Sequence, residues 1–335
     1  MTAPNRNTLW GEVLVEELAA AGLEAVCLTP GSRSTPLTVA FADHPAVTVY
    51  SHLDERASSF FALGRGRRTG EPTALVCTSG TAGANYHPAV MEADEARVPL
   101  LVLTADRPPE LSDSGANQTT DQENLYGDAV RWDRTLPEPE PAARKLRSLR
   151  VTADRAMVEA TGTPAGPVHL NVPFRKPLEP TPVPGDVPEA FFEDNRLAVE
   201  GRDGAFVETT QGRVEPRAAD VTALAGALEE ADRGLLVCGP ADAPTPTADA
   251  LARVAELTGF PVLADPLSGH RFGSHVPDCG ICGGYDSYLD GAGDWPDPDL
   301  VLRFGASPTS KVLRKYLADA ACRQVVVDPA AGWRE

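Results

Sequence analysis

The residues of this chain best suited to chemistry are polar side chains that directly follow short apolar segments. Glu55 lies in Asp54-Glu55-Arg56, between a β-branched run at 47–50 and an apolar helical run at 57–63. This places Glu55 in the first turn of a helix, at the carboxyl end of a strand, where open α/β sheets bind ligands. The simpler interpretation is an acid that only complements the helix dipole.

Three further polar loops follow short apolar segments in the same way, at residues 29–36, 78–85 and 104–111. The first is crowded with hydroxyl groups around Arg33, and the last contains Arg107. A guanidinium binds a carboxylate through two parallel hydrogen bonds, so both arginines are candidates for holding an anionic substrate. The alternative for each is an ordinary surface ion pair.

The loop at 78–85 is centred on glycine. Its first residues are Thr78, Ser79, Gly80 and Thr81. A backbone without a Cβ can approach a flat ring closely, and the neighbouring hydroxyl and amide groups can hydrogen-bond that ring. Ser79 or Thr81 can equally cap a following helix, and the two roles are compatible.

An alternation of short apolar runs and amphipathic stretches must position these loops. Strands are expected at 25–28, 47–51, 73–77, 99–104 and 167–172, with helices at 8–21, 35–43, 54–67, 81–95 and 141–160. Such alternation is typical of an α/β domain with a doubly wound parallel sheet. The carboxyl ends of parallel strands share one edge, so the loops can build a single site there.

A proline-rich acidic stretch at 176–216 divides the chain and predicts an extended linker, with a short helix at about 191–199. A second α/β unit follows it. Its strands are expected at 234–238, 261–264, 300–304 and 324–328, with helices at 217–231, 243–258 and 309–320. The expected division is therefore a first domain at 1–175, a linker at 176–216 and a second domain at 217–335.

Five strings carry a family resemblance: Pro30-Gly31-Ser32-Arg33-Ser34-Thr35-Pro36-Leu37, Asp54-Glu55-Arg56, Thr78-Ser79-Gly80-Thr81-Ala82, Thr104-Ala105-Asp106-Arg107-Pro108-Pro109-Glu110-Leu111 and Gly115-Ala116-Asn117-Gln118. In order and spacing they resemble the thiamine-diphosphate-dependent 2-succinyl-5-enolpyruvyl-6-hydroxy-3-cyclohexene-1-carboxylate synthases of menaquinone biosynthesis. The resemblance is strong over residues 7–175 and weaker to the end. It implies a pyrimidine-binding domain followed by a central Rossmann-like domain, both α/β.

The resemblance also implies an activity: decarboxylation of 2-oxoglutarate and addition of the resulting carbanion to isochorismate, with thiamine diphosphate and Mg²⁺ as cofactors. Glu55 would hydrogen-bond the pyrimidine ring as the catalytic residue. Thr78, Ser79, Gly80 and Thr81 would line that ring. The substrate contacts would be Ser32, Arg33, Arg107, Asn117 and Gln118.

In such enzymes a third domain with a Gly-Asp-Gly motif holds the diphosphate and Mg²⁺, and this sequence contains no Gly-Asp-Gly. The resemblance therefore implies a chain with the first two domains only, a truncated or split enzyme whose third domain is a separate chain or is omitted. It also implies a homodimer or a dimer of dimers, with the site at a subunit interface.

The chain has 335 residues and a strong excess of negative charge, with 48 acidic against 30 basic residues and a net charge of −18. This excess argues against nucleic acid or an anionic membrane surface as a partner. No apolar run has transmembrane length and no signal-peptide pattern is present, so a cytoplasmic protein is expected. A salt-rich cytoplasm accounts for the acidity; an arginine-rich genome with ordinary acidity is the alternative.

Cys279 and Cys282 form a Cys-x-x-Cys shortly after His270 and His275, a spacing that is compatible with zinc. A second tight pair is missing and the context is rich in glycine and proline, so two thiols in a reducing compartment are favoured.

Three other functions stay open. The Gly80 loop echoes the phosphate loop of acyl-adenylating enzymes, although the lysine of those loops is absent here. The chain also fits another thiamine-diphosphate carboligase or decarboxylase, or a non-catalytic remnant that binds ligands.

Overall fold

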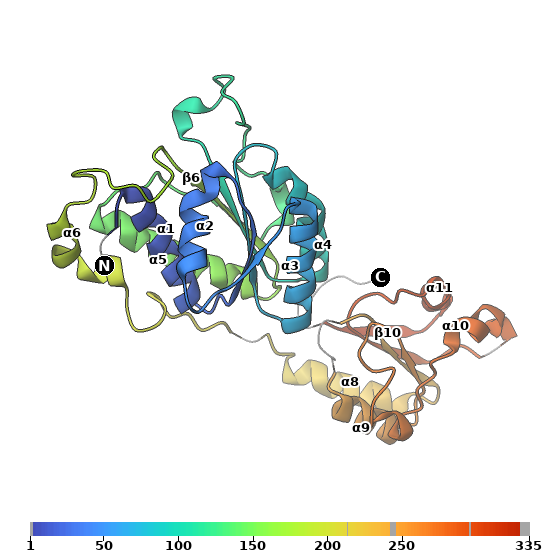
Figure 1. The fold of residues 1–335 in the computed structure, drawn as a ribbon. Helices are drawn as coiled ribbons and strands as arrows, with labels where there is room; N and C mark the ends of the chain where they lie inside the picture. The colour runs from blue at the N-terminus through green and yellow to red at the C-terminus, as the bar shows by residue number, and fades with distance from the viewer. Residues whose placement is uncertain (1–2, 213, 242–245, 295, 329–335) are drawn as a thin grey trace. The chain divides into compact units, whose positions relative to one another are not determined.

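The computed structural model describes residues 3–212, 214–241, 246–294 and 296–328. The chain forms two compact units, Met1–Gln211 and Gly212–Glu335. Each unit is an α/β structure with a parallel sheet and helices, which confirms the predicted fold class (Figure 1).

The first unit contains a six-stranded sheet in the order β2-β1-β3-β4-β6-β5. The strands are β1 (Ala25–Thr29), β2 (Thr48–Ser51), β3 (Thr73–Cys77), β4 (Leu100–Asp106), β5 (Trp132–Thr135) and β6 (Pro167–Pro173), and every pairing is parallel. All six carboxyl ends therefore lie at one edge of the sheet.

Helices cover both faces of this sheet (Figure 1). The helices are α1 (Arg6–Ala20), α2 (Thr35–Asp43), α3 (Glu55–Thr69), α4 (His87–Ala96), α5 (Ala143–Thr161), α6 (Glu189–Asp194) and α7 (Arg196–Glu200). Strand β1 shows the two-sided burial: Val26 and Leu28 pack in the core with α1, α2 and α5, whereas Cys27 packs with α3 and α4. Successive side chains of a strand point to opposite faces, so a strand buried on both sides is apolar throughout.

Local signals set both ends of α3, the helix that begins with Glu55. The side chain of Asp54 accepts a hydrogen bond from the backbone N–H of Arg56 at 2.9 Å, which caps the first turn. Gly70 ends the helix with φ of 75°, in the left-handed region that glycine adopts at helix ends. Glu55 is therefore held at the point where β2 passes into α3.

Two elements differ from the sequence-based expectation. The helix expected at 81–95 begins as a 3₁₀ turn at Gly83–Tyr86, and the α-helix starts only at His87, because Pro88 fits a first helical turn. Strand β5 was not predicted. It is a short edge strand of mixed polarity, Trp-Asp-Arg-Thr, which lacks the apolar run that marks a buried strand.

The segment expected as a linker from residue 176 packs onto the first unit as far as residue 211. Leu178, Ala198, Val199 and Phe206 are buried, and the segment contains the short helices α6 and α7. Closely spaced prolines prevent a long helix or a central strand, but they do not prevent apolar side chains from filling a groove. The first unit therefore extends beyond residue 175.

The second unit contains a four-stranded parallel sheet in the order β10-β9-β7-β8. Its elements are α8 (Ala218–Glu230), β7 (Gly234–Cys238), α9 (Ala248–Thr258), β8 (Val262–Ala264), α10 (Tyr285–Tyr288), β9 (Leu300–Phe304), α11 (Lys311–Asp319) and β10 (Arg323–Val327). The helix expected at 243–258 begins at Ala248, capped by Thr247, and residues 242–245 lie outside the described part. Among the described residues, no helix combines the length and the apolar character needed to cross a membrane.

Candidate functional site

Loops from several strands meet at the carboxyl edge of the first sheet. One close approach joins the loop after β1 to the loop after β3: a Cβ added to Gly31 would lie 2.6 Å from Cβ of Thr78. No side chain fits in that space, so glycine at position 31 permits the contact. The Arg33 loop and the Gly80 loop are thereby in direct contact.

Glu55 is half-buried at this edge, as the first residue of α3. Its carboxylate is close enough to Cys77 to act on the thiol: burial, and secondly Glu55, raise the pKa of Cys77. Tyr86 lies beside them, with its hydroxyl 2.8 Å from Oγ1 of Thr29. Glu55 is therefore an acidic group beside a buried thiol and a buried tyrosine hydroxyl.

The Gly80 loop is connected to residues 118–122. Ser79 Oγ donates to the carbonyl of Gln118 at 3.1 Å, and Nε2 of Gln118 donates to the carbonyl of Ser79 at 3.3 Å. Gly80 has φ of 86°, a conformation that favours glycine. Thr78 Oγ1 is buried and has no hydrogen-bond partner in the described structure. An unpaired buried hydroxyl is costly, so this one is available to a ligand.

Arg33 and Arg107 lie close to one another near the end of β4. Arg33 is buried and donates to the carbonyl of Phe174 at 2.7 Å, while Nε of Arg107 donates to the carbonyl of Gln118 at 3.2 Å. Burial, and secondly the charge of Arg107, lower the pKa of Arg33, whereas Asp106 raises it. Two neighbouring guanidinium groups repel each other, and a bound anion would relieve that repulsion.

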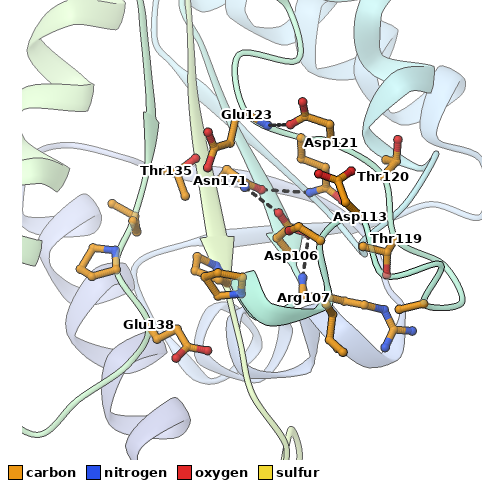
Figure 2. A pocket seen from close by; sticks show the side chains of 18 of the residues that line it. Asp106, Arg107, Asp113, Thr119, Thr120, Asp121, Glu123, Thr135, Glu138 and Asn171 are labelled. Carbon is orange, nitrogen blue, oxygen red and sulfur yellow. Dashed lines mark hydrogen bonds between the residues drawn. The ribbon is translucent and has the colours of Figure 1, made fainter.

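A pocket of about 430 Å³ opens beside Arg107, between the loop after β4 and the ends of β5 and β6 (Figure 2). Residues that line it include Asp106, Arg107, Asp121, Gln122, Glu138 and Asn171. Burial raises the pKa of Asp106, against the hydrogen bonds from Asn171 and from the Arg107 backbone. Of the residues predicted from the sequence, Arg107 lines this pocket and Glu55 does not.

The predicted residues thus form two neighbouring groups. Glu55 and the Gly80 loop lie at the ends of β1 and β3, and the two arginines lie towards β4 and β6. Ser32, Asn117 and Gln118 are exposed at the same edge, and Gln118 is the link between Ser79 and Arg107.

Sequence reasoning missed two buried amides, Gln122 and Asn171, which are each 1% exposed. Asn171 had a recognisable signal: His169 and Asn171 interrupt an otherwise apolar strand, and polar residues in a strand buried on both faces require partners. Gln122 had no comparable signal, because it lies in a long polar loop.

The residues present suit the ring of thiamine diphosphate better than they suit a metal. A carboxylate, a glycine backbone and the unpaired Thr78 hydroxyl line one edge, which is a suitable set for hydrogen bonds to an aminopyrimidine. Within the described residues, no group of three or more His, Cys, Asp or Glu side chains is arranged to hold a metal ion. At the Cys-x-x-Cys region considered for zinc, Nε2 of His275 lies 2.8 Å from the carbonyl oxygen of His270, and Cys279 is buried.

The sequence of this chain is similar to those of known thiamine-diphosphate enzymes. The family described as "Thiamine pyrophosphate enzyme, N-terminal TPP binding domain" matches residues 10–125. A protein of Haloarcula marismortui named 2-succinyl-5-enolpyruvyl-6-hydroxy-3-cyclohexene-1-carboxylate synthase is 64% identical over the whole chain, which covers 58% of that protein. Relatives with the same name are 62% identical in Natronomonas pharaonis and 51% identical in Roseiflexus castenholzii, of which the chain covers 58% and 56%.

The chain thus spans somewhat more than half the length of the curated relatives that it matches. Residues 10–125 include Glu55, the Gly80 loop, Arg33 and Arg107, so the matched range contains the predicted residues of both groups described above. Over its whole length, this chain is similar to proteins named 2-succinyl-5-enolpyruvyl-6-hydroxy-3-cyclohexene-1-carboxylate synthase, and its residues 10–125 match the N-terminal domain of thiamine pyrophosphate enzymes.

Proposed function

We propose that this chain forms part of a thiamine-diphosphate-dependent carboligase that decarboxylates 2-oxoglutarate and joins the product to isochorismate. The observation that carries the proposal is that Glu55, the Gly80 loop and the Arg33–Arg107 pair lie at one edge of the sheet. The similarity to proteins named 2-succinyl-5-enolpyruvyl-6-hydroxy-3-cyclohexene-1-carboxylate synthase supports it. The activity belongs to an enzyme of the relatives' full length, called the full-length enzyme below.

Glu55 and the Gly80 loop bind the cofactor ring. Thiamine diphosphate supplies the carbon nucleophile when it is bound. Glu55 holds a hydrogen bond against the pyrimidine from the start of α3, and the Thr78 hydroxyl, which has no protein partner in the described structure, offers another. Ser79, Gly80 and Thr81 present backbone and hydroxyl groups to the same ring.

Arg33 and Arg107 hold the substrate carboxylates. Both proposed substrates carry two carboxylates, and bidentate guanidinium contacts fix such groups in position and orientation. Ser32, Asn117 and Gln118 are exposed at the same edge and add hydrogen bonds from neutral groups. In a chain with net charge −18, this pair of cations provides the local attraction that an anionic substrate needs.

A second subunit completes the site, and the diphosphate and Mg²⁺ bind outside the described residues. Large apolar side chains are exposed next to Glu55: Leu53 is fully exposed, and Phe60 and Phe61 of α3 are 47% and 43% exposed. Such a patch beside a functional residue is typical of an interface. The assembly is a homodimer or a dimer of dimers in the cytoplasm.

Cofactor activation tests the proposal directly. In the full-length enzyme, Glu55→Gln should keep the fold and abolish exchange of the thiazolium C2 proton, followed by NMR. Glu159→Gln, which changes a half-buried glutamate of α5 that pairs with Arg155, is the matched control and should exchange at the wild-type rate. Exchange in Glu55→Gln within threefold of wild type would mean that Glu55 only complements the helix dipole.

Calorimetry tests the role of the second subunit. This chain alone should show no tight Mg²⁺-dependent binding of thiamine diphosphate, whereas the full-length enzyme should bind it. Micromolar binding by the chain alone would contradict a site that needs a partner.

A further inference from the structure

The buried amides Gln122 and Asn171 form a hydrogen-bonded bridge between the two groups of the site. Asn171 Oδ1 accepts from Thr104 Oγ1 and from Gln122 Nε2, both at 2.9 Å. Figure 2 shows the other contact, in which Asn171 Nδ2 donates to Asp106 at 2.8 Å. Oε1 of Gln122 accepts from the backbone N–H of Gly80 at 2.8 Å. The bridge therefore runs from Gly80 through two amides to Asp106.

Every polar atom of the two amides has a partner. Besides Asn171, Nε2 of Gln122 donates to the carbonyl of Ala105 at 3.2 Å. Rotating either amide by 180° would place like groups against each other, an NH₂ against the N–H of Gly80 in the case of Gln122. A fully satisfied buried network has a single geometry, because each error leaves an unpaired polar group in a low-dielectric interior.

The two ends of the bridge are the parts of the proposed site that must be placed relative to each other. Gly80 is the centre of the proposed cofactor loop. Asp106 accepts from the backbone N–H of Arg107 at 2.7 Å, and its charge acts on Arg33. Asp106 and Asn171 also line the pocket beside Arg107. Both carboxylate oxygens of Asp106 therefore accept hydrogen bonds, Oδ1 from the Arg107 backbone and Oδ2 from Asn171.

We propose that Gln122 and Asn171 are positioning residues, which fix the cofactor loop relative to the two substrate arginines. This inference rests on the proposed function. Neither amide needs to contact substrate: Gln122 acts through Gly80, and Asn171 acts through Asp106. Loss of the bridge should weaken substrate binding rather than reduce only the amount of folded enzyme.

Hydrogen exchange tests the bridge in this chain without any activity. Gln122→Met keeps the side-chain length and removes the acceptor, so the Gly80 amide should exchange at least tenfold faster than in the wild type. The amides of β3 serve as an internal reference and should be unchanged. The matched control is Gln211→Met, an exposed glutamine that bonds only the carbonyl of Val158 among the described contacts. Unchanged exchange at Gly80 in Gln122→Met would overturn the proposal.

Kinetics of the full-length enzyme test positioning. Asn171→Asp puts a carboxylate against Asp106 and removes the donor, so KM for 2-oxoglutarate should rise about tenfold. The double variant Asp106→Asn with Asn171→Asp exchanges donor and acceptor: residue 106 then donates to residue 171 and still accepts from the Arg107 amide. KM should return to within threefold of wild type.

The split between KM and kcat separates positioning from a structural role. A merely structural role lowers apparent kcat through a smaller folded fraction and leaves KM unchanged; that result, or failure of the double variant to restore KM, would overturn the proposal. An inactive wild-type enzyme would contradict the proposed function instead, and the exchange of Gly80 would then decide whether the bridge exists.

Discussion

Arg150 of α5 and Glu17 of α1 form an ion pair of 2.6 Å in which the two side chains are 1% and 0% exposed. Arg150 also donates to the carbonyls of Ala198 and Val199, and Glu17 accepts from the backbone N–H of Phe206. The pair therefore holds the segment that follows α6 against the first unit. This contact explains why the end of the expected linker, around residues 198–206, is packed rather than extended.

Breaking this pair should destabilise the first unit. Arg150→Met leaves the buried charge of Glu17 without its partner, so the free energy of unfolding should fall by roughly 3 to 5 kcal/mol. Urea denaturation measures the change. Arg147→Met, at an exposed position of the same helix, should stay within about 0.5 kcal/mol of wild type. Equal effects of the two substitutions would show that the ion pair does not anchor the segment.

Asp154 predicts a pH dependence of stability. Burial, and secondly a hydrogen bond with Glu17, raise the pKa of Asp154 from 3.8 to about 7, while the backbone N–H of Val207 and the charge of Arg150 lower it. Between pH 4 and 7 the folded state keeps a proton that the unfolded state has lost. Stability contributed by this proton is complete below pH 4 and is lost as the pH rises to 7.

Asp154→Asn mimics the protonated acid and should remove this dependence. At pH 8 the free energy of unfolding of the variant should exceed that of wild type by roughly 1 to 4 kcal/mol. This difference should vanish towards pH 4. Urea titrations at several pH values in high salt measure both proteins. A variant that is less stable than wild type at pH 8 would indicate that the pKa of Asp154 is not raised in the folded protein.

Removing either proposed substrate arginine should impair the reaction with isochorismate more than the decarboxylation of 2-oxoglutarate. In the full-length enzyme, Arg33→Ala and Arg107→Ala each remove a charge-assisted contact worth roughly 1.5 to 3 kcal/mol, a loss of about 10- to 150-fold in kcat/KM for isochorismate. Decarboxylation of 2-oxoglutarate alone should fall less. The exposed Arg144→Ala is the control. Equal losses in both reactions would mean that the arginines contact the cofactor or stabilise the fold, and do not bind the substrate.

The acidic surface should make the protein more stable in concentrated salt. With a net charge of −18, self-repulsion weakens once the Debye length falls to roughly 3 Å near 1 M salt. The melting temperature of this chain should rise between 0.1 and 2 M KCl. Several of the close relatives come from haloarchaea, which fits this expectation. A flat or falling curve would favour ordinary acidity.

Much of the candidate site is readable from local patterns. Strands of β-branched and apolar residues that end in polar loops predict a parallel sheet with those loops at one edge, and this holds for the loops after β1, β3 and β4. Periodicity and loop composition are local properties, so they show in the sequence. The roles assigned to Glu55, Arg33 and Arg107 rest on the family resemblance and stay predictions.

Only the tertiary structure decided which buried polar groups pair. Strand β6 lies between β4 and β5, out of chain order, which brings Asn171 beside Thr104 and Gln122. Gly80 and Gln122 are 42 residues apart, and Gln122 and Asn171 are 49 apart. The sequence alone determined the strand-end loops and the charge of the chain. Contacts of this separation depend on strand order and packing, which no local pattern encodes.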